Sequence, residues 1–181
     1  MTKEKLKINL PYAGAPLICA ALLMINPGGM DVIQLLRYEL ILVFGYIAAV
    51  LDARSNRIPN NLVIAMMAAW VIMMLPLLFL DTEAALTRLT DSGIGLATGG
   101  GLFFVLYLVS RKGLGGGDVK FIAAAGLYLG FKGILPVMLY GTILASLTGI
   151  VLIALKKIGR KDKIPLAPFL NAGILITVFF Q

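Results

Sequence analysis

Long uncharged stretches dominate this 181-residue chain, and they restrict its fold more than any other feature. A bilayer core of about 30 Å needs about 20 apolar residues for each helical span. Backbone groups cannot stay unpaired in lipid, so membrane spans are helices or closed barrels, and continuous rather than alternating apolar runs favour helices. The stretches cover residues 8–30, 40–51, 56–80 (interrupted by Arg57), 92–110, 121–131, 133–155 and 164–181.

We therefore expect an all-α fold, a polytopic membrane helix bundle of about six to seven transmembrane helices that forms a single domain over residues 1–181. With 60% apolar and 14% charged residues, the chain has too few polar side chains to cover a soluble surface. The second helix is expected to begin near Val32. The fifth is short for a bilayer, and it either starts in the charged segment before it, with Lys120 snorkelling, or lies inside the bundle.

The basic residues predict the orientation of the bundle. A cytoplasmic N-terminus places 13 of the 16 Lys and Arg residues on the cytoplasmic side and leaves Arg37, Arg88 and Lys132 outside. The net charge of +7 is thus explained by membrane orientation and contact with lipid, and no nucleic-acid partner is expected. We expect a multi-pass protein of the cytoplasmic membrane, with an extra N-terminal helix at about residues 8–30. Pro11 and Pro16 fit a cleaved secretory signal poorly.

Two acidic residues stand at the ends of apolar runs. Asp52 ends the second run, and Asp118 follows four glycines in five residues, Gly113 to Gly117. The chain has no histidine, which removes Ser-His and Cys-His pairs and the common zinc motif. Its single cysteine, Cys19, cannot build a cysteine-rich metal site, so no cofactor and no metal is expected.

Paired carboxyl groups, a Ser-Lys dyad or an unusual metal site remain as the chemistry for hydrolysis. We do not expect the dyad, because Ser110 and Lys112 are two residues apart and do not face each other on a helix. By the predicted orientation, Asp52 and Asp118 lie near the same cytoplasmic face. If they meet, both cannot ionise easily, so one holds a proton while the other activates water for attack on a peptide carbonyl. Simpler interpretations stay open: Asp118 as the N-cap of its helix, the glycines as a flexible loop, and Asp52 with Arg54 and Arg57 as a solvated cluster.

Three segments in order resemble one family, the type IV prepilin peptidases, which are intramembrane aspartyl peptidases with a Gly-x-Gly-Asp signature. The first runs from Gly115 to Lys120, the second combines Asp52-x-Arg54 with Ile58-Pro59-Asn60, and the third runs from Lys163 to Leu170. The resemblance covers about residues 40–181. Leu166 and Ala167 depart from the family pattern, which has Phe and Gly there.

The resemblance implies an endopeptidase that cuts the short basic leader from prepilins or pseudopilins on the cytoplasmic side, commonly after a glycine. Asp52 and Asp118 would be the catalytic pair, and Gly115, Gly116 and Gly117 the active-site loop. Candidate contacts with substrate or structure are Arg54, Pro59, Lys120, Pro165 and Pro168.

Many bacterial members of this family also carry a cysteine-rich zinc domain after the first helix and methylate the new N-terminus. The short connection at residues 26–31 and the single cysteine lead us to expect a minimal form without N-methyltransferase activity. Two other functions stay open, a small proton-coupled transporter and a non-enzymatic membrane assembly factor. The sequence identifies neither the substrate nor the oligomeric state.

Overall fold

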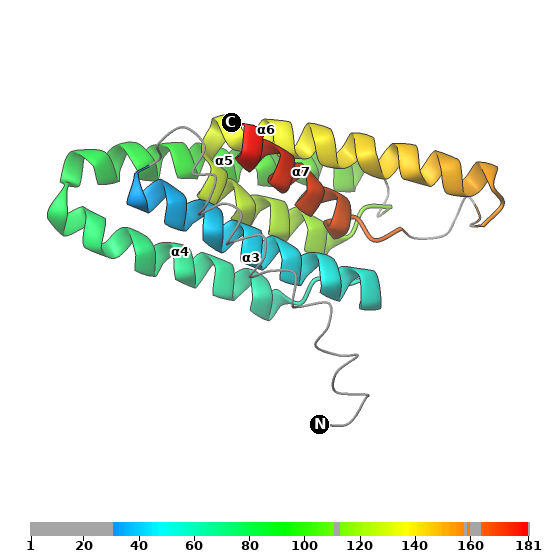
Figure 1. Ribbon diagram of the computed structural model, residues 1–181, viewed down its shortest axis with the longest axis horizontal. Helices are drawn as coiled ribbons and strands as arrows, with labels where there is room; N and C mark the ends of the chain where they lie inside the picture. Colours follow the sequence, from blue (N-terminus) through cyan, green and yellow to red (C-terminus); the bar gives the residue numbers. More distant parts are fainter. Residues whose placement is uncertain (1–30, 111–112, 158, 160–163, 181) are drawn as a thin grey trace, which may run out of the picture.

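The computed structural model describes residues 31–110, 113–157, 159 and 164–180, so the helix expected at residues 8–30 lies outside the described residues. All regular secondary structure in the described residues is α-helical, which confirms the all-α prediction. The helices lie roughly along one axis (Figure 1). They are α3 (Val32–Ser55), α4 (Asn60–Leu80), α5 (Thr82–Val109), α6 (Gly116–Ala154) and α7 (Ala167–Phe180).

The first of these helices begins where the sequence predicts. α3 starts at Val32, because the Asp31 carboxylate accepts the Gln34 N–H at 2.7 Å and caps the helix. It ends at Ser55, where Asn56 adopts the left-handed conformation and donates its N–H to the Asp52 carbonyl at 2.7 Å. Asp52 therefore lies in the last turn of a helix that is apolar over most of its length.

Helix α5 is longer than its uncharged stretch, which begins at residue 92. It starts ten residues earlier, at Thr82, and the Asp81 carboxylate caps it by accepting the Ala84 N–H at 3.0 Å. The added turns carry charged side chains. Hydropathy therefore marks the apolar part of the helix, while the cap determines where the helix itself begins.

Helix α6 reverses direction at Gly130, whose φ of 66° lies in a region that disfavours L side chains. A Cβ added at Gly99 of α5 would contact both Ile122 and Ile134. These residues are 12 positions apart, or about 18 Å in a straight helix, so the two halves of α6 must run antiparallel (Figure 1). The break expected at Lys132 thus occurs two residues earlier.

The first half of α6 lies in the interior of the bundle. Phe121, Ile122, Ala125 and Tyr128 have no exposed surface. The helix begins at Gly116, within the charged segment before the apolar run, and its burial places it inside the bundle, so both expected features of the short fifth helix occur together. Because Asp118 is in the first turn of this half, the acid is carried by the most enclosed helix of the fold.

Close helix packing surrounds this interior segment. A Cβ at Gly95 of α5 would overlap the carbonyl oxygen of Gly126 in α6, so the two backbones touch. α7 packs against α3 and α6, the red helix between them in Figure 1. The four helices α3 to α6 are long and apolar enough to cross a membrane, and α7 is shorter. The count of six to seven spans and the cytoplasmic N-terminus stay predictions.

Candidate active site

The carboxyl group of Asp52 is held by the start of α7. Asp52 is 5% exposed, and its Oδ2 accepts the backbone N–H of Ala167 at 3.0 Å. Ala167 is the first residue of α7, where backbone N–H groups lack partners within the helix and favour a negative charge. The interpretation of Asp52 as a member of a solvated cluster is therefore wrong, because the side chain is enclosed between two helices.

The carboxyl group of Asp118 lies in the first turn of α6. The residue is 9% exposed, and its Oδ1 is buried with no hydrogen-bond partner among the described residues. The N-cap of α6 is Gly115, not Asp118, and the Asp118 N–H donates to the Gly115 carbonyl at 3.1 Å. The interpretation of Asp118 as the N-cap residue is therefore wrong, although its carboxyl lies close to the Gly115 backbone at the start of the helix.

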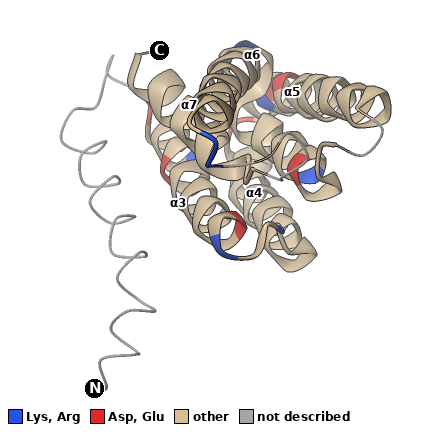
Figure 2. Cartoon of the chain, turned by 90° about the vertical axis from the view of Figure 1, so that its right-hand side faces the viewer, with Lys and Arg blue, Asp and Glu red and all other residues tan. Residues whose placement is uncertain are grey.

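The two carboxyl groups lie within electrostatic range of each other. The charge of Asp52 acts on the Asp118 carboxyl, although the two residues are 66 positions apart in the sequence. The last turn of α3 and the first turn of α6 stand at the same end of the bundle, which Figure 2 shows from that side. The helix arrangement thus places both acids at one end of the bundle, and their direct meeting stays a prediction.

The glycines before Asp118 lack side chains, which allows neighbouring atoms to approach the turn closely on two sides. A Cβ at Gly115 would lie 2.7 Å from Asp118 Oδ2, and a Cβ at Gly117 would lie 3.2 Å from the Cβ of Ile58. A Cβ at Gly116 would meet nothing within 4 Å. Gly116 and Gly117 belong to the first turn of α6, so the expectation of a purely flexible loop is wrong for these two.

Lys120 connects α6 to the start of α4. Its Nζ donates a hydrogen bond to Asn60 Oδ1 at 3.0 Å. Pro59, the exposed residue before Asn60, has the extended conformation from which α4 begins. Arg54 is exposed in the last turn of α3. Lys120 thus has a partner within the protein, and Arg54 and Pro59 lie at the exposed ends of α3 and α4.

The two late prolines flank the amide that holds Asp52. Pro165 is half-buried before α7. Pro168 is the second residue of α7, where a backbone N–H has no partner within the helix, so proline costs no hydrogen bond there. The sequence could not identify the Ala167 amide as part of the site. Every residue except proline carries an N–H, so the residue type gives no sign of which amide binds the carboxylate. Nor did the sequence indicate a role for Asn60 or Ile58, although both stand in a segment already singled out.

Potential metal ligands do not gather in the described part of the chain. No group of three or more His, Cys, Asp or Glu side chains that could hold an ion occurs among residues 31–110, 113–157, 159 and 164–180. The site therefore consists of two carboxyl groups, the backbone amides at the start of α7 and a glycine turn. Paired carboxyls of this kind can act as acid and base on one substrate.

Comparison with known proteins gives consistent matches. Proteins named prepilin leader peptidase/N-methyltransferase are similar to this chain in three bacteria. The Xanthomonas campestris pv. campestris protein is 29% identical over 130 residues, which cover 72% of this chain and 45% of the relative. The Bacillus subtilis protein is 28% identical over 137 residues, covering 74% and 51%, and the Burkholderia pseudomallei protein is 28% identical over 182, covering 94% and 53%.

The chain spans about half the length of these relatives. No solved structure matches it. The model of the type IV leader peptidase family matches residues 40–153, a range that includes Asp52 and Asp118 and ends before α7. Because this match covers more than half of the sequence, the chain belongs to the type IV leader peptidase family.

Proposed function

We propose that this protein is an intramembrane aspartyl endopeptidase that removes the short basic leader from a prepilin-like or pseudopilin substrate. The relatives' names supply the substrate class. One observation carries the proposal: Asp52 and Asp118 are both buried, come from different helices, and lie within electrostatic range at one end of the bundle. Few other roles explain two enclosed carboxyls in a membrane bundle.

The chemistry follows from the two side chains. One carboxylate removes a proton from a water molecule as the water oxygen attacks the scissile carbonyl carbon. The other carboxyl donates a hydrogen bond to the carbonyl oxygen. The C–N bond then breaks, and the leaving amine takes a proton from the pair. The Ala167 N–H donates to Oδ2 of Asp52 and so holds this carboxyl in position for the proton transfer.

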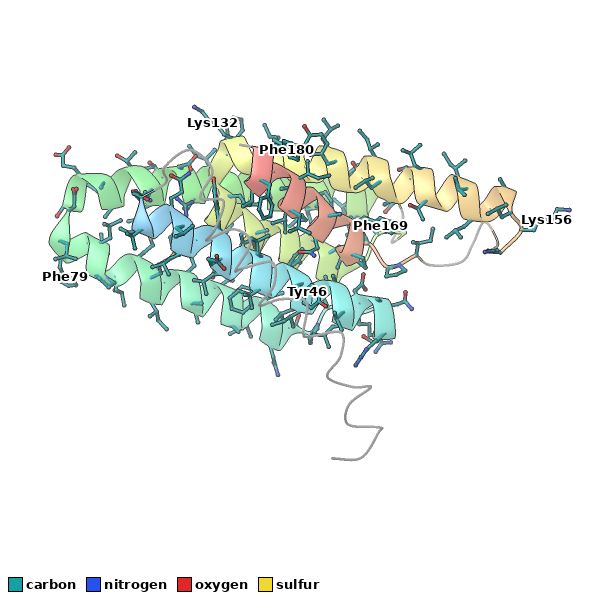
Figure 3. The ribbon with its side chains drawn as sticks, viewed as in Figure 1. Tyr46, Phe79, Lys132, Lys156, Phe169 and Phe180 are labelled. Carbon is teal, nitrogen blue, oxygen red and sulfur yellow. The ribbon has the colours of Figure 1, made fainter. Side chains whose placement is uncertain are left out.

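The cytoplasmic face is proposed for the acid end of the bundle. The described basic residues at this end are exposed: Arg54, Arg57, Lys120, Lys156 and Lys157. Figure 3 places Lys156 at the tip of α6 on this side and Lys132 at the other end of the same half-helix. An excess of basic residues is typical of cytoplasmic loops. The substrate would then lie with its apolar helix in the bilayer and its leader at this face.

Substitution of each acid by asparagine tests the proposal. Asp52→Asn and Asp118→Asn should each abolish leader cleavage, measured as a mobility shift of a co-expressed prepilin, while membrane insertion stays normal. Asp81→Asn is the matched control, because asparagine caps a helix as well as aspartate does. Full cleavage by either active-site variant would remove that acid from the mechanism and favour a transporter or an assembly factor.

The expected lack of N-methyltransferase activity stays a prediction. Its test is the mass of the new N-terminus after cleavage in a strain without another leader peptidase. An unmodified amine is the expected product. A methylated one would show that this protein or a separate enzyme adds the group, and purified components would then decide between them.

A further inference from the structure

A buried arginine lies at the end of the bundle opposite the acid pair. Arg37, in the second turn of α3, is 7% exposed. Its guanidinium donates to Ser92 Oγ at 3.3 Å and to the Leu127 carbonyl at 3.2 Å, while its Nε has no partner among the described residues. A cation at this depth is costly, so its presence calls for a function. The proposed cleavage chemistry does not use it.

The arginine belongs to a polar cluster that joins three helices. Ser92 and Asp91 are neighbours on α5, and the charge of Asp91 attracts Arg37. Asp91 Oδ1 accepts the N–H of Phe131, the first residue after the reversal in α6, at 3.1 Å. We call Arg37, Asp91, Ser92 and the Leu127 carbonyl the polar latch. It ties α3 and α5 to both halves of α6.

Each helix that carries a catalytic candidate is held by this latch. On α3, Arg37 and Asp52 are 15 residues apart, or about 22 Å. On α6, Leu127 and Asp118 are nine residues apart, or about 13 Å. A slip of one residue at the latch shifts a helix by about 1.5 Å and rotates its side chains by about 100°. A contact that fixes this register would therefore set how the two carboxyls face each other.

We propose that Arg37 is a positioning residue, which acts through the latch to set the separation of the Asp52 and Asp118 carboxyls. This inference rests on the proposed peptidase function for its kinetic consequence, but its geometric part does not. The competing explanation is that Arg37 only contributes to stability. Removal of one partner of a buried charged contact is destabilising in either case, so the two explanations differ in the distance between the carboxyls, which changes only if Arg37 positions the helices.

Distances between spin labels test the geometric part without any cleavage assay. The labels are placed at Ser55→Cys on α3 and Gly116→Cys on α6, with the single native cysteine changed by Cys19→Ser. Both sites are exposed, and Gly116 has open space around it. Arg37→Met should shift or broaden the distance distribution relative to the labelled parent. Ser92→Ala, which removes one acceptor, should give a smaller change of the same kind.

Turnover tests the kinetic part in the unlabelled full-length protein. A misplacement of about 1 Å can cost roughly 100-fold in rate. We therefore expect Arg37→Met to lower kcat by roughly 10- to 100-fold, with KM unchanged, because Arg37 lies about 22 Å along α3 from Asp52. Arg37→Lys keeps the charge and one hydrogen bond, so it should recover part of kcat.

Two controls separate position from stability and charge. Lys132→Gln removes an exposed cation at the same end that takes no part in the latch, and it should leave distances and kcat unchanged. Met74→Ala opens the core of α4 and should lower the thermal midpoint without moving the labels. An unchanged distance distribution in Arg37→Met overturns the inference, and so does a raised KM with normal kcat. If the parent itself cleaves no prepilin, the peptidase function fails while the distance result still stands.

Discussion

The glycine turn before Asp118 offers the sharpest test of the proposed site. Alanine at Gly115 would place a Cβ 2.7 Å from Asp118 Oδ2, whereas ordinary contacts begin near 3.4 Å. The carboxyl oxygen must therefore move by about 0.7 Å or rotate away from its present position. Alanine at Gly116 would meet nothing within 4 Å, so it is a matched control one residue away.

The expected loss follows from this displacement. Since a misplacement of about 1 Å can cost roughly 100-fold, a shift of this size should lower kcat by roughly 10- to 100-fold in Gly115→Ala. Gly116→Ala should retain at least half of the parent kcat, and its helix propensity improves by up to about 1 kcal/mol. Stability should change little in Gly115→Ala, because alanine at the N-cap costs only about 1 kcal/mol.

The assay is cleavage of a purified prepilin by each variant in the same lipid or detergent, with kcat and KM measured separately. Thermal unfolding of the same samples shows whether the fold is retained. Equal turnover by the Gly115→Ala and Gly116→Ala proteins would refute the reasoning, because the carboxyl of Asp118 would then tolerate displacement. A loss of kcat in Gly116→Ala alone would contradict it as well.

Three further substitutions test the parts around the site. Ala167→Pro removes the N–H that donates to the Asp52 carboxylate. Because a hydrogen bond to a charged group contributes about 1.5–3 kcal/mol, kcat should fall roughly 10- to 100-fold. Ala167→Gly keeps the N–H and should stay active, and equal rates for the two variants would exclude a role of this amide in catalysis. Gly95→Ala should lower the free energy of unfolding by about 1–3 kcal/mol through overpacking against α6, as measured by thermal or denaturant unfolding. Gly93→Ala, which has open space around it, should leave the free energy of unfolding unchanged. Ser55→Cys without Cys19 should react with an impermeant maleimide only from the cytoplasmic side, and labelling of intact cells would reverse the proposed orientation.

Much of the helical frame could be predicted from the sequence. The bilayer requires long apolar runs, so these runs revealed α3, α4, α5 and the two halves of α6 without any tertiary information. The start of α3 near Val32 and the interior position of the short fifth helix were also accessible in this way. The exact ends were not, because caps such as Asp81 depend on single side chains that hydropathy does not weigh.

The chemistry of the site was determined by the residue types themselves. The chain has no histidine, and two acids, Asp52 and Asp118, stand at the ends of apolar runs, so few groups remain that could catalyse hydrolysis. A charge beside lipid is costly and therefore indicates a function. Only the tertiary structure decided what surrounds these acids. The amide of Ala167 and the latch at Arg37 act through backbone groups and long-range packing, and neither can be predicted from the type of the residue. The lipid solvent requires the apolar composition of the helices, whereas the packing of the helices determines which atoms distant in the sequence come into contact.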